Sequence, residues 1–370
     1  MSTLAKFVGL DVHKSSIAMA VAEGGPFDEV EELGTLPHDV TRVLRRLERL
    51  GPPESLHVAY EAGPTGYGLY RALRREGIDC VVVAPSKTPQ RSGDRVKTDR
   101  RDALKLARYL RSNELVAIAP PSAEREAQRD LLRAREDVMR AQHRARQQLS
   151  SMLLRHGRIF EGKSSWTQPH LQWIKSQRFD AAPQQEAFDD YVTEVLRLSQ
   201  RLAHLSEQVE HHVSNSEYVQ LFKALMALRG VSVIVAATIV VELGDLSQFP
   251  SAPQLMSFVG LTPSEHSSGA SVQRGSITKA GNPHVRRTLV EAAWSSRLEP
   301  RLSLALMRRS QGLAPEVLAI ADKARRRLHK RYWHLIHTGK SKQTAVVACA
   351  REFVGFIWAI ARVVREQPTH

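Results

Sequence analysis

The segment Lys6–His13 reads KFVGLDVH, and after two residues Ser16–Glu23 reads SIAMAVAE. Both are short and rich in apolar residues, which is typical of two paired strands. Alternate residues of a strand lie on one face, so Asp11 and His13 share a face of the first strand. A carboxylate in an apolar strand is costly unless it is paired or binds a cation. Asp11 is therefore a candidate functional residue.

Strand-like and helix-like segments alternate through the first 112 residues. Further β-rich runs occur at His57–Ala62 and Cys80–Pro85, and helical patterns occupy Thr41–Leu50, Tyr67–Glu76 and about 98–111. Strands joined by helical crossovers indicate an α/β domain with a mixed sheet. We predict that this domain spans residues 1–115.

The rest of the chain has helical patterns. Two long segments with a sparse apolar stripe, Glu124–Leu154 and Phe188–Val213, lie within residues 116–225. They predict an antiparallel helical hairpin or an oligomerising coiled coil, and a structural helix pair without further function is an equal alternative. Residues 226–370 predict a mostly α domain that carries a Ser- and Gly-rich loop at Thr262–Gly281. A length of 370 residues fits two or three domains.

The composition restricts the kinds of partner and cellular compartment that fit this chain. Lys and Arg number 53 and Asp and Glu 39, a net charge of +14, which points to a polyanionic partner. Cys80 and Cys349 are too few for a disulfide framework or a zinc ribbon, which favours a reducing cytosol. The start of the chain lacks the pattern of a signal peptide. Val231–Val241 is too short to span a bilayer and Thr344–Val364 is interrupted by charges, so both predict core helices and no membrane.

Three further acids accompany Asp11. Glu61 ends a second predicted strand, and Asp99 and Asp102 lie three residues apart at the start of a predicted helix, on one face. The four carboxylates are expected to converge at the strand ends of one sheet. Such oxygen ligands suit Mg²⁺ or Mn²⁺, and two such ions can assist displacement at a phosphodiester. Basic residues beside them are expected to hold a phosphate backbone, namely Lys97, Arg100, Arg101 and Lys105.

Structural interpretations of these acids remain open. Asp99 could be an N-cap, and Asp102 could be a first-turn acid favoured by the helix dipole. Glu61 could pair with an arginine. Asp11 is the hardest of the four to explain without a ligand.

The segment Gly260–Gly281 reads GLTPSEHSSGASVQRGSITKAG and holds five serines. It leads into a predicted helix, and backbone amides at a helix start can bind phosphate. A serine here has no evident His/Asp partner, so a nucleophilic serine would need activation by the metals. A turn without function is the alternative. The expected nucleic-acid contacts in this region are Arg274, Lys279, Arg286 and Arg287.

Five segments in order resemble the DEDD insertion-sequence transposases, some of which are known as bridge-RNA-guided recombinases. They are GLDVHKSSI, YEAGPTGYGLYRAL, KTDRRDALKLARYL, FVGLTPSEHSSGASVQRGSITKAGNPHVRRTLVEAAW and GKSKQTAVVACAREF. The resemblance runs nearly end to end and is weakest across about 157–190. It implies an α/β RuvC-like (RNase H-like) N-terminal domain, a coiled-coil middle and a mostly α C-terminal transposase domain.

The same resemblance implies roles for particular residues. The family's four acids fall on Asp11, Glu61, Asp99 and Asp102, and its nucleophilic serine falls on Ser268, with Ser267 one position away. The implied reaction joins donor and target DNA through a covalent serine–DNA intermediate. It takes place in a homo-oligomer, a dimer or tetramer, where the serine of one subunit meets the carboxylates of another. A noncoding bridge RNA is implied as a guide, and a cytoplasmic, nucleoid-associated location follows.

Three other functions stay open on the residues alone. One is a metal-dependent nuclease of the junction-resolvase type, in which water attacks. Another is a nucleic-acid-binding scaffold whose acids form salt bridges. The third is an actin-like or sugar-kinase ATPase, which Gly9-Leu10-Asp11 also suits, although a second α/β domain and a phosphate loop are not visible in the sequence.

Overall fold

The computed structural model describes residues 5–25, 29–85, 88, 98–268 and 271–366. Two compact units divide the chain, Met1–Pro121 and Ser122–His370. The predicted division into three domains at residues 115 and 225 remains a prediction.

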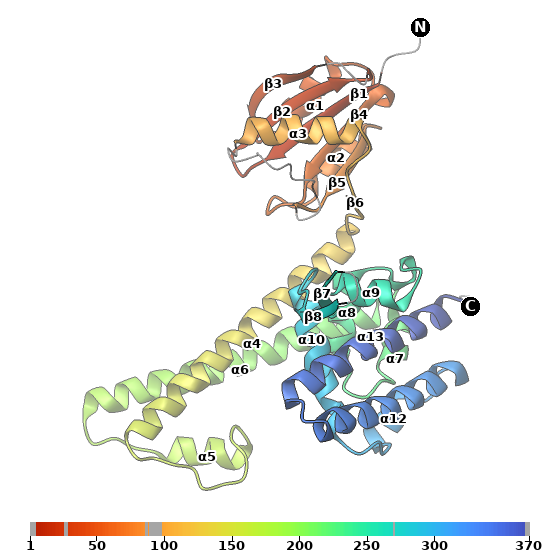
Figure 1. Ribbon diagram of the computed structural model, residues 1–370. Coiled ribbons are helices and arrows are strands. Elements are labelled where there is room, and N and C mark those ends of the chain that lie inside the picture. The colour runs from red at the N-terminus through yellow and green to blue at the C-terminus, as the bar shows by residue number, and fades with distance from the viewer. Residues whose placement is uncertain (1–4, 26–28, 86–87, 89–97, 269–270, 367–370) are drawn as a thin grey trace. The chain divides into compact units, whose positions relative to one another are not determined.

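The first unit is built on a six-stranded sheet in the order β3-β2-β1-β4-β5-β6 (Figure 1). Its strands are β1 Lys6–Val12, β2 Ser16–Glu23, β3 Val30–Pro37, β4 Leu56–Glu61, β5 Asp79–Val83 and β6 Ala117–Ile118. The first three strands pair antiparallel, β1, β4 and β5 pair parallel, and β6 is antiparallel to β5. The helices are α1 Val40–Glu48, α2 Gly68–Arg75 and α3 Asp99–Arg111, with a 3₁₀ turn at Pro53–Ser55. This mixed sheet is consistent with the predicted RNase H-like α/β domain.

The two faces of β2 explain how the layers form. Ile17, Met19 and Val21 pack into the core that also contains residues of α1 and α2. The alternate residues are alanines at 18, 20 and 22, and they pack against Ala103 and Ala107 of α3. Since alanine has the smallest apolar side chain, this face lets α3 lie close to the sheet.

Gly9 brings α3 into backbone contact with β1. A Cβ atom at Gly9 would collide with the carbonyl oxygen of Ala103 and the amide nitrogen of Ala107. Asp11 lies two residues further along the strand, and Asp99 lies one helical turn before Ala103. The close approach therefore places the start of α3 beside Asp11.

Gly9→Ala is expected to destabilise the protein by about 1–3 kcal/mol, because overpacking forces backbone shifts. Urea denaturation measures the change. Gly68→Ala is the matched control, since a Cβ there meets nothing within 4 Å and Gly68 begins a helix, where alanine is favoured. Equal stability of the two variants would contradict the close contact between β1 and α3.

The second unit begins with two 33-residue helices, α4 Ala123–Arg155 and α6 Ala182–Ser214, which lie side by side (Figure 1). They form an antiparallel hairpin within one chain, one of the two predicted arrangements. The segment that connects them contains α5 Gln168–Ser176. Trp166 and Trp173 pack against the apolar cluster of the hairpin.

Except for the short α11, the remaining helices share one core with the base of this hairpin. They are α7 Val219–Leu225, α8 Val233–Leu243, α9 Ala252–Phe258, α10 Pro283–Ala293, α11 Leu304–Arg309, α12 Pro315–His337 and α13 Lys342–Glu366, with 3₁₀ turns at Leu246–Gln248 and Trp294–Arg297. By length and composition α13 could cross a membrane, but half of its most apolar window is buried inside the protein. Both α8 and α13 are core helices, as expected.

The prediction of a loop over Thr262–Gly281 is wrong for most of that segment. Strands β7 Pro263–Ser268 and β8 Ser271–Ile277 form an antiparallel hairpin, in which Ser267 pairs with Val272 and Ser268 with Ser271. Serine and glycine content suggested a loop. Because the strand bonds come from the backbone, small polar residues can still form a hairpin.

Candidate active site

Asp11 lies near the end of β1 with only 19% of its side chain exposed. Burial raises the pKa of its carboxyl above the usual value, and His13 opposes this rise through its charge and a hydrogen bond. The nearby carboxylates of Asp99 and Asp102 raise the pKa further. The ionised form of Asp11 is therefore held in an unfavourable setting, which a bound cation would relieve.

His13 joins the acid of the strand to an acid of the helix. Its Nε2 atom lies 3.1 Å from Oδ2 of Asp11 and 3.5 Å from Oδ1 of Asp99. One ligand atom from each of the three residues lies within 4.8 Å of the others. Sequence reasoning did not assign His13 to the site, although strand alternation put it on the face of Asp11.

The start of α3 explains why Asp99 reaches this group. Thr98 is the N-cap, and its hydroxyl oxygen accepts a hydrogen bond from the backbone N–H of Arg101. Asp99 is therefore not the N-cap, and its carboxylate is turned to His13. Asp102 follows one turn later, with its Oδ1 atom 3.7 Å from Nζ of Lys105.

Glu61 ends β4, the parallel neighbour of β1. The last paired residues of β1 and β4 are Leu10 and Tyr60. Asp11 and Glu61 come directly after this pair, on adjacent strands. The hydroxyl of Thr88 donates a hydrogen bond of 2.7 Å to Oε1 of Glu61. The structure thus gathers Asp11 with Asp99 and His13, places Asp102 nearby, and leaves Glu61 at the adjacent strand end, outside the three-residue group.

The donor set fits a divalent cation. Carboxylate oxygens are the ligands that Mg²⁺ and Mn²⁺ prefer, and an imidazole nitrogen is compatible with Mn²⁺. Thiolate ligation has no support from the two cysteines, because both are buried. Burial raises the pKa of Cys80 to about 12 and that of Cys349 to about 11.

Of the four basic residues predicted to bind phosphate beside the acids, three contact other groups of the protein. Nε of Arg100 lies 3.0 Å from Oε1 of Glu32, and the Arg100 side chain is 68% exposed. Lys105 approaches Asp102, and the Arg101 backbone closes the cap of α3. Lys97 lies outside the described residues. Nucleic-acid binding by these four residues remains a prediction.

At the base of the β7–β8 hairpin, two predicted phosphate contacts have protein partners. Nη1 of Arg286 donates to the carbonyl oxygens of Val259 at 3.2 Å and Ala280 at 2.9 Å. Arg287 pairs with Glu136 and Glu291 at 3.0 Å each. Both guanidinium groups therefore hold the protein together here, and DNA contact by either remains a prediction.

The other residues predicted to contact nucleic acid, and the two candidate nucleophilic serines, lie in or next to the β7–β8 hairpin. Lys279 has a positive φ of 55°, and its backbone N–H donates to the carbonyl of Gly260 at 3.2 Å. Arg274 pairs in register with Glu265. The backbones of Ser267 and Ser268 lie in β7, whereas the side chains of these serines and of Arg274 are outside what the structure describes.

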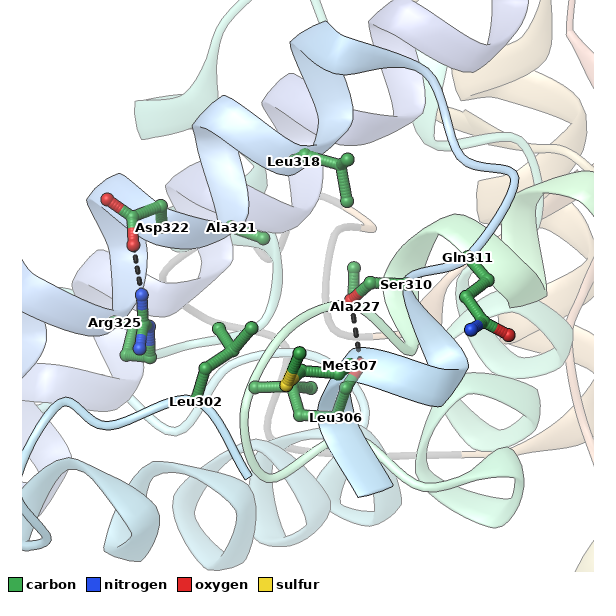
Figure 2. A pocket seen from close by; sticks show the side chains of 10 residues that line it. All are labelled: Ala227, Leu302, Leu306, Met307, Ser310, Gln311, Leu318, Ala321, Asp322 and Arg325. Atoms are coloured by element: carbon green, nitrogen blue, oxygen red, sulfur yellow. Dashed lines mark hydrogen bonds and ion pairs between the residues drawn. The ribbon is translucent and has the colours of Figure 1, made fainter. Parts of the chain in front are cut away.

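A cavity of about 420 Å³ in the second unit is separate from all predicted site residues (Figure 2). Three of its polar side chains bond within the lining, since Arg325 pairs with Asp322 and the Ser310 hydroxyl donates to the Leu306 carbonyl at 2.8 Å. The rest of its lining is largely apolar. We assign no chemistry to this cavity.

Comparison with known proteins places both units in the class of transposases. Residues 8–157 match the DEDD transposase family of IS110 elements, and residues 222–304 match the family described as Transposase IS116/IS110/IS902. The chain is 43% identical to the putative transposase y4qE of Sinorhizobium fredii over 97% of this chain and 89% of that protein. It is 31% identical to the transposase for insertion sequence element IS1533 of Leptospira borgpetersenii over 89% and 96% of the two chains.

These similarities cover nearly the whole chain. The protein therefore belongs to the IS110 family of transposases, and DNA transposition is the activity of its class.

Proposed function

We propose that this transposase excises and integrates an insertion sequence by metal-assisted DNA cleavage through a covalent phosphoserine intermediate. The observation that carries the proposal is the convergence of Asp11 and Asp99 around His13 at the strand ends. The resemblance to the DEDD transposases supplies the role of Ser268.

Asp11, Asp99, Asp102 and Glu61 are the proposed ligands of Mg²⁺ or Mn²⁺. A bound ion of this kind lowers the pKa of an attacking hydroxyl and neutralises charge on the phosphate. His13, which lies at hydrogen-bonding distance from Asp11, orients that carboxylate.

Ser268 is the proposed nucleophile. Its Oγ atom loses its proton and attacks phosphorus, and the DNA oxygen leaves with the electron pair of the broken P–O bond and takes up a proton. The phosphoserine diester conserves the energy of the original bond. A hydroxyl of the new partner strand then attacks the same phosphorus and releases the serine hydroxyl, so joining needs no external energy source.

A metal-dependent nuclease that uses water is the second candidate. The cluster of Asp11, His13 and Asp99, here called the acidic group, favours this candidate. Carboxylates that bind a metal can equally assist the attack of water. The test is incubation of the protein and Mg²⁺ with DNA carrying the element's ends, followed by denaturing electrophoresis. If a serine attacks, we expect a covalent protein–DNA adduct that survives denaturation. If water attacks, we expect only cleaved DNA.

The proposed partners are donor and target DNA, a noncoding bridge RNA and further copies of this chain in a dimer or tetramer. With guidance by base pairing, the protein would contact mainly backbone and shape. The proposed location is the cytoplasm, at the nucleoid. A structured RNA that co-purifies with the protein would support the guide, and full activity of protein freed of RNA would contradict it.

Arg286→Ala is expected to slow adduct formation by about tenfold or more, because it removes charge-assisted hydrogen bonds of about 1.5–3 kcal/mol at the hairpin base. Gel assays of adduct formation at saturating DNA measure the effect. Arg309→Ala is the control, since Nη1 of Arg309 donates to the carbonyl of Val231 at 2.6 Å in the same unit. Equal slowing by both variants would show a general loss of stability instead of a role for the hairpin base.

A further inference from the structure

The second half of α4 is strongly basic. From Val138 to Arg155 it carries four arginines and no acidic residue. Two of these arginines have protein partners, since Arg140 pairs with Glu136 and the guanidinium of Arg146 lies 4.9 Å from the centre of the Trp166 ring. The other two are Arg144 and Arg155.

Arg144 and Arg155 are exposed. Within the described part of the chain, no hydrogen bond or ion pair holds either guanidinium. Spacings of three and four residues place Arg144, Gln148, Ser151 and Arg155 on one helix face. This face therefore presents cationic donors that the fold itself does not use.

A hollow of about 340 Å³ lies on this face. Its lining, which we call the α4 groove, consists of Arg144, Gln147, Gln148, Ser151 and Arg155 of α4 and Tyr191 of α6. Every lining side chain can donate a hydrogen bond and none is a carboxylate. Side chains of these types make most phosphate contacts in protein–DNA complexes.

The neighbouring helix carries acids of its own near the groove, and the exposed Asp189 and Asp190 directly precede Tyr191, but neither lines the hollow. Glu194 lies one turn beyond Tyr191 on α6, and its carboxylate is bound by Nε of Arg197 at 2.7 Å. That pair is neutral as a whole. The groove therefore retains the two positive charges of its arginines.

The length of the groove fits a run of phosphates. Arg144 and Arg155 are eleven residues apart, which corresponds to about 16 Å along a helix axis. One strand of B-DNA presents about five phosphates over that distance along the duplex axis. Two guanidinium groups with amide and hydroxyl donors between them match such a row.

We propose that the α4 groove binds the phosphate backbone of duplex DNA at a distance in the chain from both the acidic group and the serine hairpin. The choice of DNA rests on the transposase class of the protein. Arginine, glutamine and serine donors aimed at phosphates fix the position of a duplex but carry no sequence information. The groove would thus hold DNA of any sequence.

The test is the salt dependence of binding to a short duplex of arbitrary sequence, measured by fluorescence anisotropy in EDTA. Arg144→Gln combined with Arg155→Gln is expected to reduce the slope of log K against log salt by about 2, because each phosphate contact contributes about 0.9. Glutamine keeps helix propensity, and circular dichroism verifies folding. Since EDTA removes any metal, the result is independent of cleavage and of Ser268.

Two further variants make the test specific. Arg144→Lys with Arg155→Lys is expected to keep most of the slope, because lysine also binds phosphate. Lys175→Gln with Arg201→Gln removes the same charge from exposed positions of α5 and α6 outside the groove and is expected to leave the slope unchanged. An unchanged slope in the first variant, an equal loss in this control, or a loss seen with RNA but not with DNA would overturn the proposal.

Discussion

Asp11→Asn is expected to lower the rate of Mg²⁺-dependent DNA cleavage by about three orders of magnitude, since metal assistance is worth several kcal/mol. Asp11 is the acid most enclosed by the candidate site, with Asp99, Asp102 and His13 around it. An amide oxygen carries no charge and is a much weaker ligand. Cleavage of end-containing DNA at saturating enzyme measures the loss.

The folded state should tolerate this substitution. The pKa of Asp11 is raised on folding, so at neutral pH its ionised form is less favourable in the folded protein than in the unfolded chain. Asparagine removes that unfavourable charge, and we expect no fall in melting temperature in EDTA. We expect Mn²⁺ to raise the melting temperature of the unsubstituted protein, and Asp11→Asn should lose this increase.

Glu54→Gln is the control for Asp11→Asn, because Glu54 is an exposed acid of the same unit outside the acidic group. It should retain both cleavage and the response to Mn²⁺. Undiminished Mg²⁺-dependent cleavage by Asp11→Asn would refute the metal site.

Ser268→Ala is expected to abolish the denaturation-resistant protein–DNA adduct, because alanine has no oxygen with which to attack phosphorus. DNA binding should change little, since the loss of one hydroxyl leaves the positive charges in place. Denaturing gels of reactions with radiolabelled DNA ends report the adduct, and anisotropy reports binding.

Ser267→Ala is the matched comparison. Ser267 carries the same hydroxyl one position earlier in β7, so its replacement removes an equivalent group from a neighbouring residue. We expect Ser267→Ala to retain the adduct. Adduct formation by Ser268→Ala, or its loss in Ser267→Ala alone, would move the nucleophile elsewhere.

The central strands of the first unit were predictable from the sequence because they are apolar on both faces. In β2, for example, Ile17 to Ala22 are all buried. The edge strand β3 was missed, since its exposed Glu31 and Glu32 interrupt the apolar pattern, as is common at edges. The two-residue β6 is too short to leave a pattern.

The candidate site was predictable in part. Asp11 and Asp99 were named from the sequence, and the structure brings them together. His13 was missed because a single histidine at a strand end has many structural explanations. The pairing of Arg286 with the carbonyl of Val259 and of Arg287 with Glu136 could not be foreseen, because these partners come from distant parts of the chain.

The alanine face of β2 and the bare backbone of Gly9 determine how far α3 stands from the sheet. Acids on two separate elements can share one ion only at a separation that suits its radius. In this protein that separation is set by the alanine methyl groups that pack between β2 and α3, away from the charged groups. If these acids bind a metal ion as proposed, selectivity between small and large cations would depend on core packing, and engineering it would begin with side-chain volume beneath α3.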